Sequence, residues 1–158
     1  MEDSISSILI LVLLITMSAY FSATETAYSS LNKIKLKSIA NKGNKKAKLA
    51  LELSEKYDSM ISTILIGNNI VNIATASLAT VLFTKLLGSS GVTVSTIVMT
   101  ILILIFGEIS PKSIAKDIPE SFAIFSAPLL NVFCIILKPV NHLFCLWKKV
   151  ISKVFKIQ

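Results

Sequence analysis

Histidine, cysteine and arginine are scarce in this sequence, which has one histidine, two cysteines and no arginine in 158 residues. Cys134 and Cys145 lie in apolar surroundings without a C-x-x-C spacing, so we interpret them as structural thiols rather than as a disulfide or a soft-metal site. The sequence has no motif for covalent chemistry, and we expect no enzyme activity. Aromatic and basic residues are not interleaved as in RNA-binding proteins, which argues against a nucleic-acid partner.

Long apolar runs dominate the chain instead. Hydrophobic residues make up 53% of it, and the mean hydropathy is +0.74. Runs of about 18 or more mostly apolar residues are typical of transmembrane helices. We therefore expect one domain, 1–158, that is an all-α integral membrane protein with three transmembrane helices at about 5–29, 59–87 and 92–115.

Lysine carries the whole net charge of +7, and its distribution orients the chain. Seven lysines lie between Lys33 and Lys48, in a segment (31–56) where we expect a pair of short cytoplasmic helices divided at 41–44. The N-terminus is acidic and the turn at 88–91 is uncharged. The positive-inside rule then places the N-terminus outside the plasma membrane and the C-terminus in the cytoplasm. The lysines also suit contact with anionic membrane lipids.

A fourth crossing would disturb this orientation. It would use the apolar segment 120–137 and would carry the basic tail, 138–158, to the outside. We therefore expect a re-entrant or in-plane juxtamembrane helix at 120–137. No internal repeat is visible, so the inverted-repeat signature of many transporters is absent, although a homodimer would supply a second half by symmetry.

Polar residues interrupt the first span in "SAYFSATETAYS". Ser18, Ser22, Glu25 and Ser29 are spaced by four, three and four residues, which places them on one helical face. The pattern is also typical of a span that simply ends at the interface, with Glu25 solvated.

The second span contains "STILIGNNIVNIA". Asn68 and Asn72 share a helical face, and Asn69 lies three residues before Asn72. Amides inside a span are costly unless they are hydrogen-bonded. Bonding between helices would satisfy them, with Gly67 allowing a close approach, so this cluster alone leaves a structural interpretation open.

The third span ends in "IFGEISPK". Glu108 lies about 24 Å along this helix from Val92, at ~1.5 Å per residue, and is thus an intramembrane carboxylate. Pro111 has no N–H, so in an α-helix the Gly107 carbonyl four residues earlier would lose its donor. The alternative is a simple kink in which Glu108 pairs with Lys112.

Together the three clusters supply hydroxyl, amide, carbonyl and carboxylate oxygens. Such a set, without imidazole or thiolate, favours Mg²⁺, Ca²⁺ or Na⁺ over transition metals.

The stretches "FSATETAYSSLNKIKLKSIANKG", "STILIGNNIVNIATASLAT" and "FGEISPKSIAK" closely resemble the transmembrane module of the CorC/cyclin-M (CNNM) family of magnesium transport proteins. The resemblance covers about residues 5–137. It implies three spans, a cytoplasmic helical pair, a juxtamembrane helix and a homodimer. Family members usually continue into a cytoplasmic pair of CBS domains that bind ATP; no such sequence occurs in 1–158, and we expect that pair in the full-length protein.

The resemblance also implies a set of metal ligands. Carried over by motif, they are Ser22, Asn69 with Asn68 nearby, and Glu108 with the Gly107 carbonyl. Supporting positions are Glu25, Asn72 and Pro111, whereas Ser18 and Ser29 match no family motif and rest only on the shared helical face.

The function that this implies is Mg²⁺ export by alternating access, coupled to Na⁺ entry. Three alternatives stay open. The chain would be a Mg²⁺ sensor that regulates other proteins, a Na⁺-selective site or pore, or a purely structural helical bundle.

Overall fold

The structure, a computed structural model, describes residues 2–155, and within this range every regular element is a helix. The prediction of an all-α membrane protein is confirmed. The elements follow one another as α1 (Glu2–Ser30), α2 (Lys33–Asn41), α3 (Lys45–Glu55), α4 (Tyr57–Leu87), the short η1 (Gly88–Ser90), α5 (Gly91–Leu102), the π-helix η2 (Ile103–Ile109), α6 (Ser110–Asp117), α7 (Pro119–Ile136) and α8 (Lys138–Phe155).

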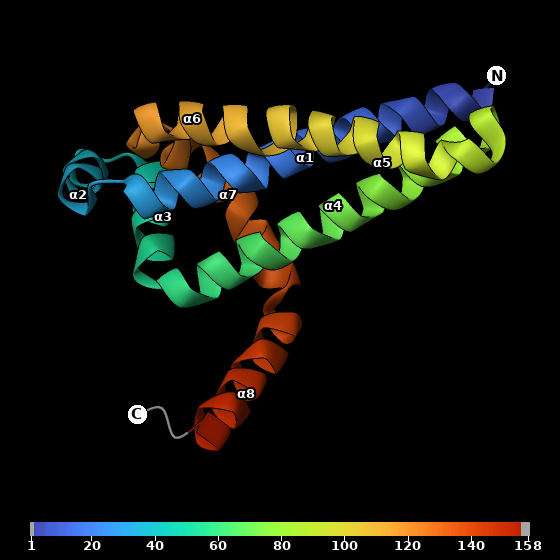
Figure 1. The fold of residues 1–158 in the computed structure, drawn as a ribbon. Helices are drawn as coiled ribbons and strands as arrows, with labels where there is room; N and C mark the ends of the chain where they lie inside the picture. The colour runs from blue at the N-terminus through green and yellow to red at the C-terminus, as the bar shows by residue number, and fades with distance from the viewer. Residues whose placement is uncertain (1, 156–158) are drawn as a thin grey trace.

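Three stretches are long and apolar enough to cross a membrane: Ser4–Ser30, Tyr57–Asp117 and Pro119–Ile136. The middle stretch has 61 residues, about 90 Å at ~1.5 Å per residue, or three times the ~30 Å of a hydrocarbon core. It therefore has to fold back. Figure 1 shows that it does so between α4 and α5, which makes two crossings of one stretch.

The reversal between α4 and α5 depends on two glycines. Gly88 has a φ of +64°, a conformation that other residues rarely adopt. At Gly91 a Cβ would overlap the Phe83 backbone, so only glycine permits this approach of the two helices. Helix α4 then runs antiparallel to α1 and to the continuous rod formed by α5, η2 and α6 (Figure 1).

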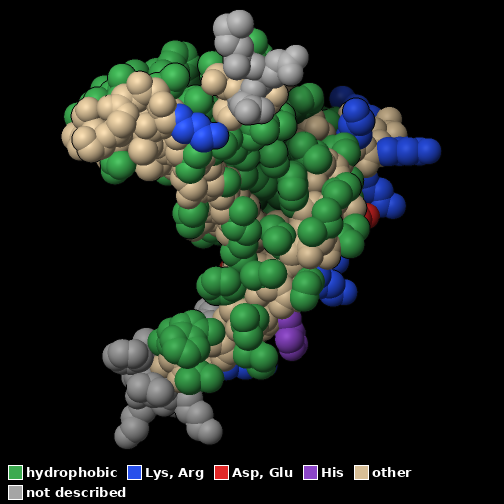
Figure 2. All heavy atoms as spheres, turned by 90° about the vertical axis from the view of Figure 1, so that its right-hand side faces the viewer, with side chains coloured by type: hydrophobic (Ala, Val, Ile, Leu, Met, Phe, Trp, Pro, Cys, Tyr) green, Lys and Arg blue, Asp and Glu red, His purple; other side chains and the backbone are tan. Residues whose placement is uncertain are grey.

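The outer surface of this bundle is apolar. Large hydrophobic side chains are exposed along α1, α4 and α5, among them Leu9, Ile73 and Ile97. In Figure 2 hydrophobic side chains cover most of the bundle, while lysines gather along one edge. Such a surface is stable only in contact with lipid or another protein, in agreement with a multi-pass membrane protein.

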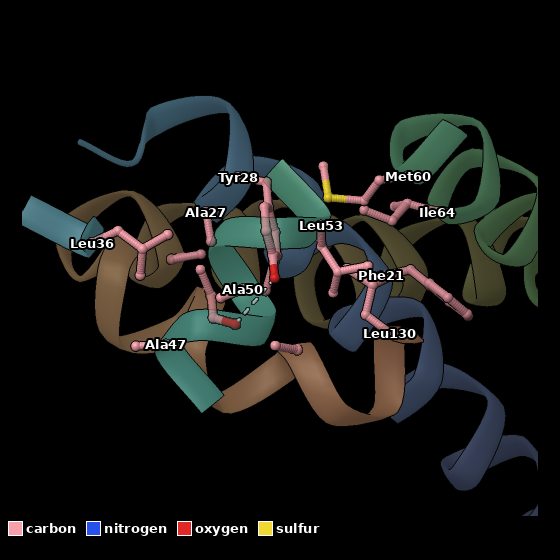
Figure 3. Close-up of a cluster of buried hydrophobic side chains, with 14 of the residues drawn as sticks. Phe21, Ala27, Tyr28, Leu36, Ala47, Ala50, Leu53, Met60, Ile64 and Leu130 are labelled. Carbon is pink, nitrogen blue, oxygen red and sulfur yellow. Dashed lines mark hydrogen bonds between the residues drawn. The ribbon is translucent and has the colours of Figure 1, made fainter. Parts of the chain in front are cut away.

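The lysine-rich segment forms the expected pair of short helices. The side chain of Asn32 caps α2 by accepting hydrogen bonds from the backbone N–H groups of Ile34 and Lys35, and Asn44 caps α3. The buried face of this pair belongs to the larger apolar cluster of the protein. Figure 3 shows the cluster where α1, α3, α4 and α7 converge, with Phe21, Tyr28, Leu53 and Leu130 among its members.

Helix α7 starts beside α2 and ends near the middle of α4. At its start, the Glu120 carboxylate accepts a hydrogen bond from the Asn32 backbone N–H at 3.0 Å and pairs with the Lys35 ammonium at 3.0 Å. Near its end, Leu137 lines the same small cavity as Gly67 and Val71, which lie well inside α4. Its composition would allow a crossing, but in this arrangement α7 enters the bundle only part-way.

The tail after α7 is helical, which the sequence interpretation as a basic tail over 138–158 did not include. Helix α8 returns from the end of α7 toward the beginning of α4, where the Asn141 amide donates to the Thr63 hydroxyl at 2.6 Å. It then projects away from the bundle (Figure 1). Residues 156–158 of the predicted tail, and the Cys145 side chain, lie outside the described residues.

Candidate functional site

The predicted polar residues come together where α1, α4 and η2 meet. Ser18 lies about 24 Å from the start of α1 and Asn72 about 22 Å from the start of α4, at ~1.5 Å per residue. Gly107 lies about 24 Å from the start of α5 on the same scale. The three positions are thus deep within their helices, so this polar cluster sits inside the apolar part of the bundle.

Ser18 is the centre of the cluster. Its side chain is fully buried at 0% exposure, and its hydroxyl lies 2.7 Å from the Asn72 amide oxygen and 3.2 Å from that of Asn68. A serine hydroxyl has one proton, so it donates fully to only one of these two acceptors. Three oxygens therefore converge with a single proton among them, an arrangement in which a cation would be stabilised.

Gly107 brings η2 against this cluster. A Cβ at this position would lie 3.0 Å from the Ser18 hydroxyl oxygen and 3.4 Å from the Ser18 Cβ. Any side chain would therefore press on Ser18. The glycine leaves the η2 backbone close to the Ser18 hydroxyl. The backbone ligand expected at Gly107 stays a prediction.

The helix around Gly107 has π geometry, which changes the consequence of Pro111. The Ser110 N–H donates to the carbonyl of Ile105, five residues earlier. In this register residue 111 would serve the Phe106 carbonyl, whereas in an α-helical register it would serve that of Gly107. Proline denies its donor to both. Two consecutive carbonyls, those of Phe106 and Gly107, therefore precede Glu108 without a donor from residue 111.

Ser22 contributes a further polar group one turn along α1. Its side chain is 1% exposed, and its hydroxyl has no hydrogen-bond partner among the described residues. A buried hydroxyl without a partner costs roughly 1–3 kcal/mol. A buried hydroxyl that neither donates nor accepts a hydrogen bond is a typical feature of a binding site without its ligand.

The carboxylates lie toward the α6 end of this cluster. Glu25 pairs with Lys112 at 3.4 Å, and both side chains are partly exposed. The alternative pairing of Lys112 with Glu108, considered from their spacing, is therefore not adopted. Glu108 is half-buried and forms no ion pair within residues 2–155.

Asn69 is placed differently from its neighbours. It is exposed, and its side chain makes no hydrogen bond among the described residues, whereas Asn68 and Asn72 turn toward α1. The structure thus brings together Asn68, Asn72, Gly107 and Ser18. Asn69 faces outward, toward lipid or a partner.

Family motifs did not identify Ser18. The usable signal was geometric, because Ser18 and Ser22 share a face of α1 and Ser18 is fully buried when that face packs on α4. The set as a whole consists of oxygen groups. Within the described residues no group of three or more histidine, cysteine or acidic side chains lies together.

Comparison with known proteins identifies relatives of the whole module. Residues 9–158 match the family described as the cyclin M transmembrane N-terminal domain. A UPF0053 protein of Haemophilus influenzae is 43% identical over 123 residues, which are 78% of this chain and 29% of the relative. The UPF0053 inner membrane protein YfjD of Escherichia coli is 42% identical over 121 residues, which are 77% of this chain and 28% of that protein.

A third relative has a function in its name. The polyamine export protein of Haemophilus influenzae is 30% identical over 164 residues, which cover 96% of this chain and 38% of the relative. The chain thus spans 28–38% of the length of these three relatives. An inner membrane protein and an exporter among them suggest a function in membrane transport.

Proposed function

The chain belongs to the cyclin M transmembrane domain family, and from this premise we propose that it carries Mg²⁺ across the membrane. The observation that supports this most is the convergence of Ser18, Asn68 and Asn72 oxygens beside Gly107, inside the bundle. Mg²⁺ prefers oxygen ligands and keeps several waters. A few neutral oxygens and one carboxylate suit a cation that has to bind and then leave again.

In this proposal Glu108 supplies the anionic ligand. The amide oxygens of Asn68 and Asn69, the Ser22 hydroxyl and the Gly107 carbonyl supply neutral ligands, with Ser18 and Asn72 completing the cluster. Asn69 would join it only if α4 rotated, which is the kind of movement that alternating access requires. The π turn at η2 suits such a movement, because a helix that already contains a wide turn can shift register there at small cost.

The direction and coupling complete the proposal. We place the N-terminus outside and α2 and α3 in the cytoplasm of a plasma-membrane protein, since lysine-rich segments are retained on that side. Mg²⁺ then leaves the cell while Na⁺ enters, and two copies of the chain form the working unit. In the full-length protein a cytoplasmic CBS pair would follow.

A flux measurement tests the proposal. The protein is reconstituted into vesicles that contain a Mg²⁺-sensitive dye, and Mg²⁺ entry is recorded with and without an opposing Na⁺ gradient. We expect flux above that of empty vesicles, dependent on Na⁺ and abolished by Glu108→Gln. The matched control is Glu52→Gln, which removes an exposed carboxylate on α3 and should leave flux unchanged.

Two other results would replace the proposal. Mg²⁺ binding by the purified protein without any flux would make it a sensor that regulates other proteins. If the protein showed no Mg²⁺ binding and no Mg²⁺ flux, that result would contradict the site itself. If it bound Na⁺ and Mg²⁺ did not displace that Na⁺, the site would be a Na⁺ site.

A polyamine is the second candidate cargo, and the observation in its favour is the polyamine exporter among the relatives. Amide oxygens and the carboxylates of Glu25 and Glu108 would accept hydrogen bonds from ammonium groups. The same vesicles with labelled spermidine in place of Mg²⁺ separate the two cargoes. Spermidine flux that Mg²⁺ does not inhibit would favour the polyamine.

A further inference from the structure

Helix α8 has an apolar face that nothing in the described chain covers. Leu143, Trp147 and Val150 follow one another at i, i+4 and i+7 and are all exposed, and Phe144 and Ile151 extend the same stripe. On the opposite face Lys138, His142 and Lys149 are exposed at i, i+4 and i+11. The helix is therefore strongly amphipathic, with a basic polar face.

Hydrogen bonds hold the start of α8 against the first turns of α4. The Asn141 amide is 6% exposed and donates to the Thr63 hydroxyl at 2.6 Å and to the Ser59 carbonyl at 3.3 Å. Both acceptors belong to the first two turns of α4. Since α4 crosses the membrane, this anchor holds α8 near the boundary of the bilayer on the side where α2 and α3 lie.

From this anchor α8 runs away from the bundle rather than continuing alongside it. Figures 1 and 2 both show it as an arm that leaves the other helices sideways. Its polar residue Ser152 and its aromatic residue Trp147 still line a shallow pocket with Asp58 at the start of α4, so the arm stays at the level of that helix end. The apolar stripe is thus presented at the edge of the bilayer.

The positive charge of residues 138–158 favours an anionic lipid surface as the partner of α8. Residues 138–158 contain five lysines and no acidic residue. Basic amphipathic helices bind membrane surfaces by inserting their apolar face at the boundary of headgroups and acyl chains, while lysines reach the anionic headgroups. A lipid surface is also necessarily present at this level, because the neighbouring helices span the membrane.

We infer that α8 is a membrane-surface helix that binds anionic phospholipid in the leaflet on the α2–α3 side. The apolar stripe, with Leu143, Trp147 and Val150, inserts into the part of the acyl chains next to the headgroups. The lysines Lys138 and Lys149 contact the headgroup phosphates. The site goes beyond ion transport. It attaches the segment that follows the bundle to the membrane, and it makes the position of that segment dependent on lipid charge.

Trp147 is the only tryptophan in the chain and reports on this site directly. The protein is reconstituted into two preparations of phosphatidylcholine vesicles. One contains brominated phosphatidylcholine, and the other contains the same fraction of brominated phosphatidylglycerol. We expect Trp147 emission to be quenched by both brominated lipids, more strongly by the phosphatidylglycerol, and only weakly by aqueous acrylamide. High salt should reduce the preference for the anionic lipid.

Lysine variants test the assignment of the charge. Lys149→Gln should lower the preference for phosphatidylglycerol by up to about fivefold, the effect of one lysine at a membrane surface. Lys85→Gln, at the opposite end of α4, is the control and should leave it unchanged. Strong acrylamide quenching without quenching by brominated lipid would overturn the inference, because α8 would then lie in water.

Two further outcomes would also overturn it. Quenching by neither probe would mean that a second copy of the chain or another protein covers the stripe. Equal quenching by the two brominated lipids, unaffected by salt and by Lys149→Gln, would mean that α8 inserts without recognising anionic headgroups.

Discussion

Replacing Ser18 by alanine is the most direct test of the polar cluster. The hydroxyl is completely buried and lies within 3.2 Å of two amide oxygens, 2.7 Å from that of Asn72 and 3.2 Å from that of Asn68. Alanine has the same backbone preferences in a helix or better ones, and it adds no atom. The substitution therefore removes one donor and leaves two amide oxygens facing each other without a proton between them.

The magnitude follows from the number of protons. One hydroxyl proton supports one full hydrogen bond, and hydrogen bonds between helices in membranes contribute about 0.6–1.7 kcal/mol. Asn72 is half-buried, so we expect a loss of unfolding free energy of about 1 kcal/mol, within this range. If the same bond positions the amide oxygens for Mg²⁺, the dissociation constant rises by about three- to fifteenfold.

The measurements are thermal unfolding in detergent and calorimetric titration with Mg²⁺. Ser29→Ala is the control, since Ser29 is on the same face of α1 but is exposed at its end. Its hydroxyl contacts the Tyr57 hydroxyl at 3.1 Å in exposed surroundings, so we expect Ser29→Ala to leave the Mg²⁺ affinity unchanged and to lower stability less than Ser18→Ala does. Unaltered Mg²⁺ affinity in Ser18→Ala, together with lost affinity in Asn68→Ala, would refute the central position of Ser18.

Two other substitutions test how the helices around the site are held. Gly67→Ala would place a Cβ 2.5 Å from the Phe21 ring, so the ring has to move, and we expect a destabilisation of about 1–3 kcal/mol by thermal unfolding; unchanged stability would show that the ring has free space. Lys112→Gln removes the partly exposed pair with Glu25, and we expect less than about 1 kcal/mol in the same assay. A loss of several kcal/mol would show that this pair is shielded from solvent.

Hydrophobic runs and glycine positions were enough to predict the long helices. The apolar segment boundaries agree within a few residues with α1, α4 and the rod from Gly91 to Asp117. The lysine-rich pair was recognisable because the segment 41–44 is a strong signal for a helix stop. The structure adds that Asn44 caps the start of α3. Helix α8 was not predicted. Its lysines and apolar residues form two faces only once the segment is helical, and the apolar face stays largely exposed among the described residues.

The sequence predicted part of the geometry of the polar cluster, whereas its role as a metal site stays a prediction. The spacing of Asn68 and Asn72 predicts a shared face, and this pair indeed turns toward α1. Spacing alone leaves the rotation of α4 about its axis undetermined, so it could not separate Asn68 from Asn69. The consequence of Pro111 required the helix register as well, because the π turn adds the Phe106 carbonyl to the Gly107 carbonyl as a group that residue 111 would otherwise serve.

The asparagines of α4 have an alternative, purely structural role, in which they only form hydrogen bonds between helices. The bond between Ser18 and Asn72 is an interhelical hydrogen bond of the kind that this interpretation requires. It does not account for the Ser22 hydroxyl, which is buried without a partner among residues 2–155. Nor does it require the close approach of η2 at Gly107, where a Cβ would lie 3.0 Å from the Ser18 hydroxyl oxygen. Helix packing is served by satisfied bonds, so the unpartnered Ser22 hydroxyl supports the cation site that we propose.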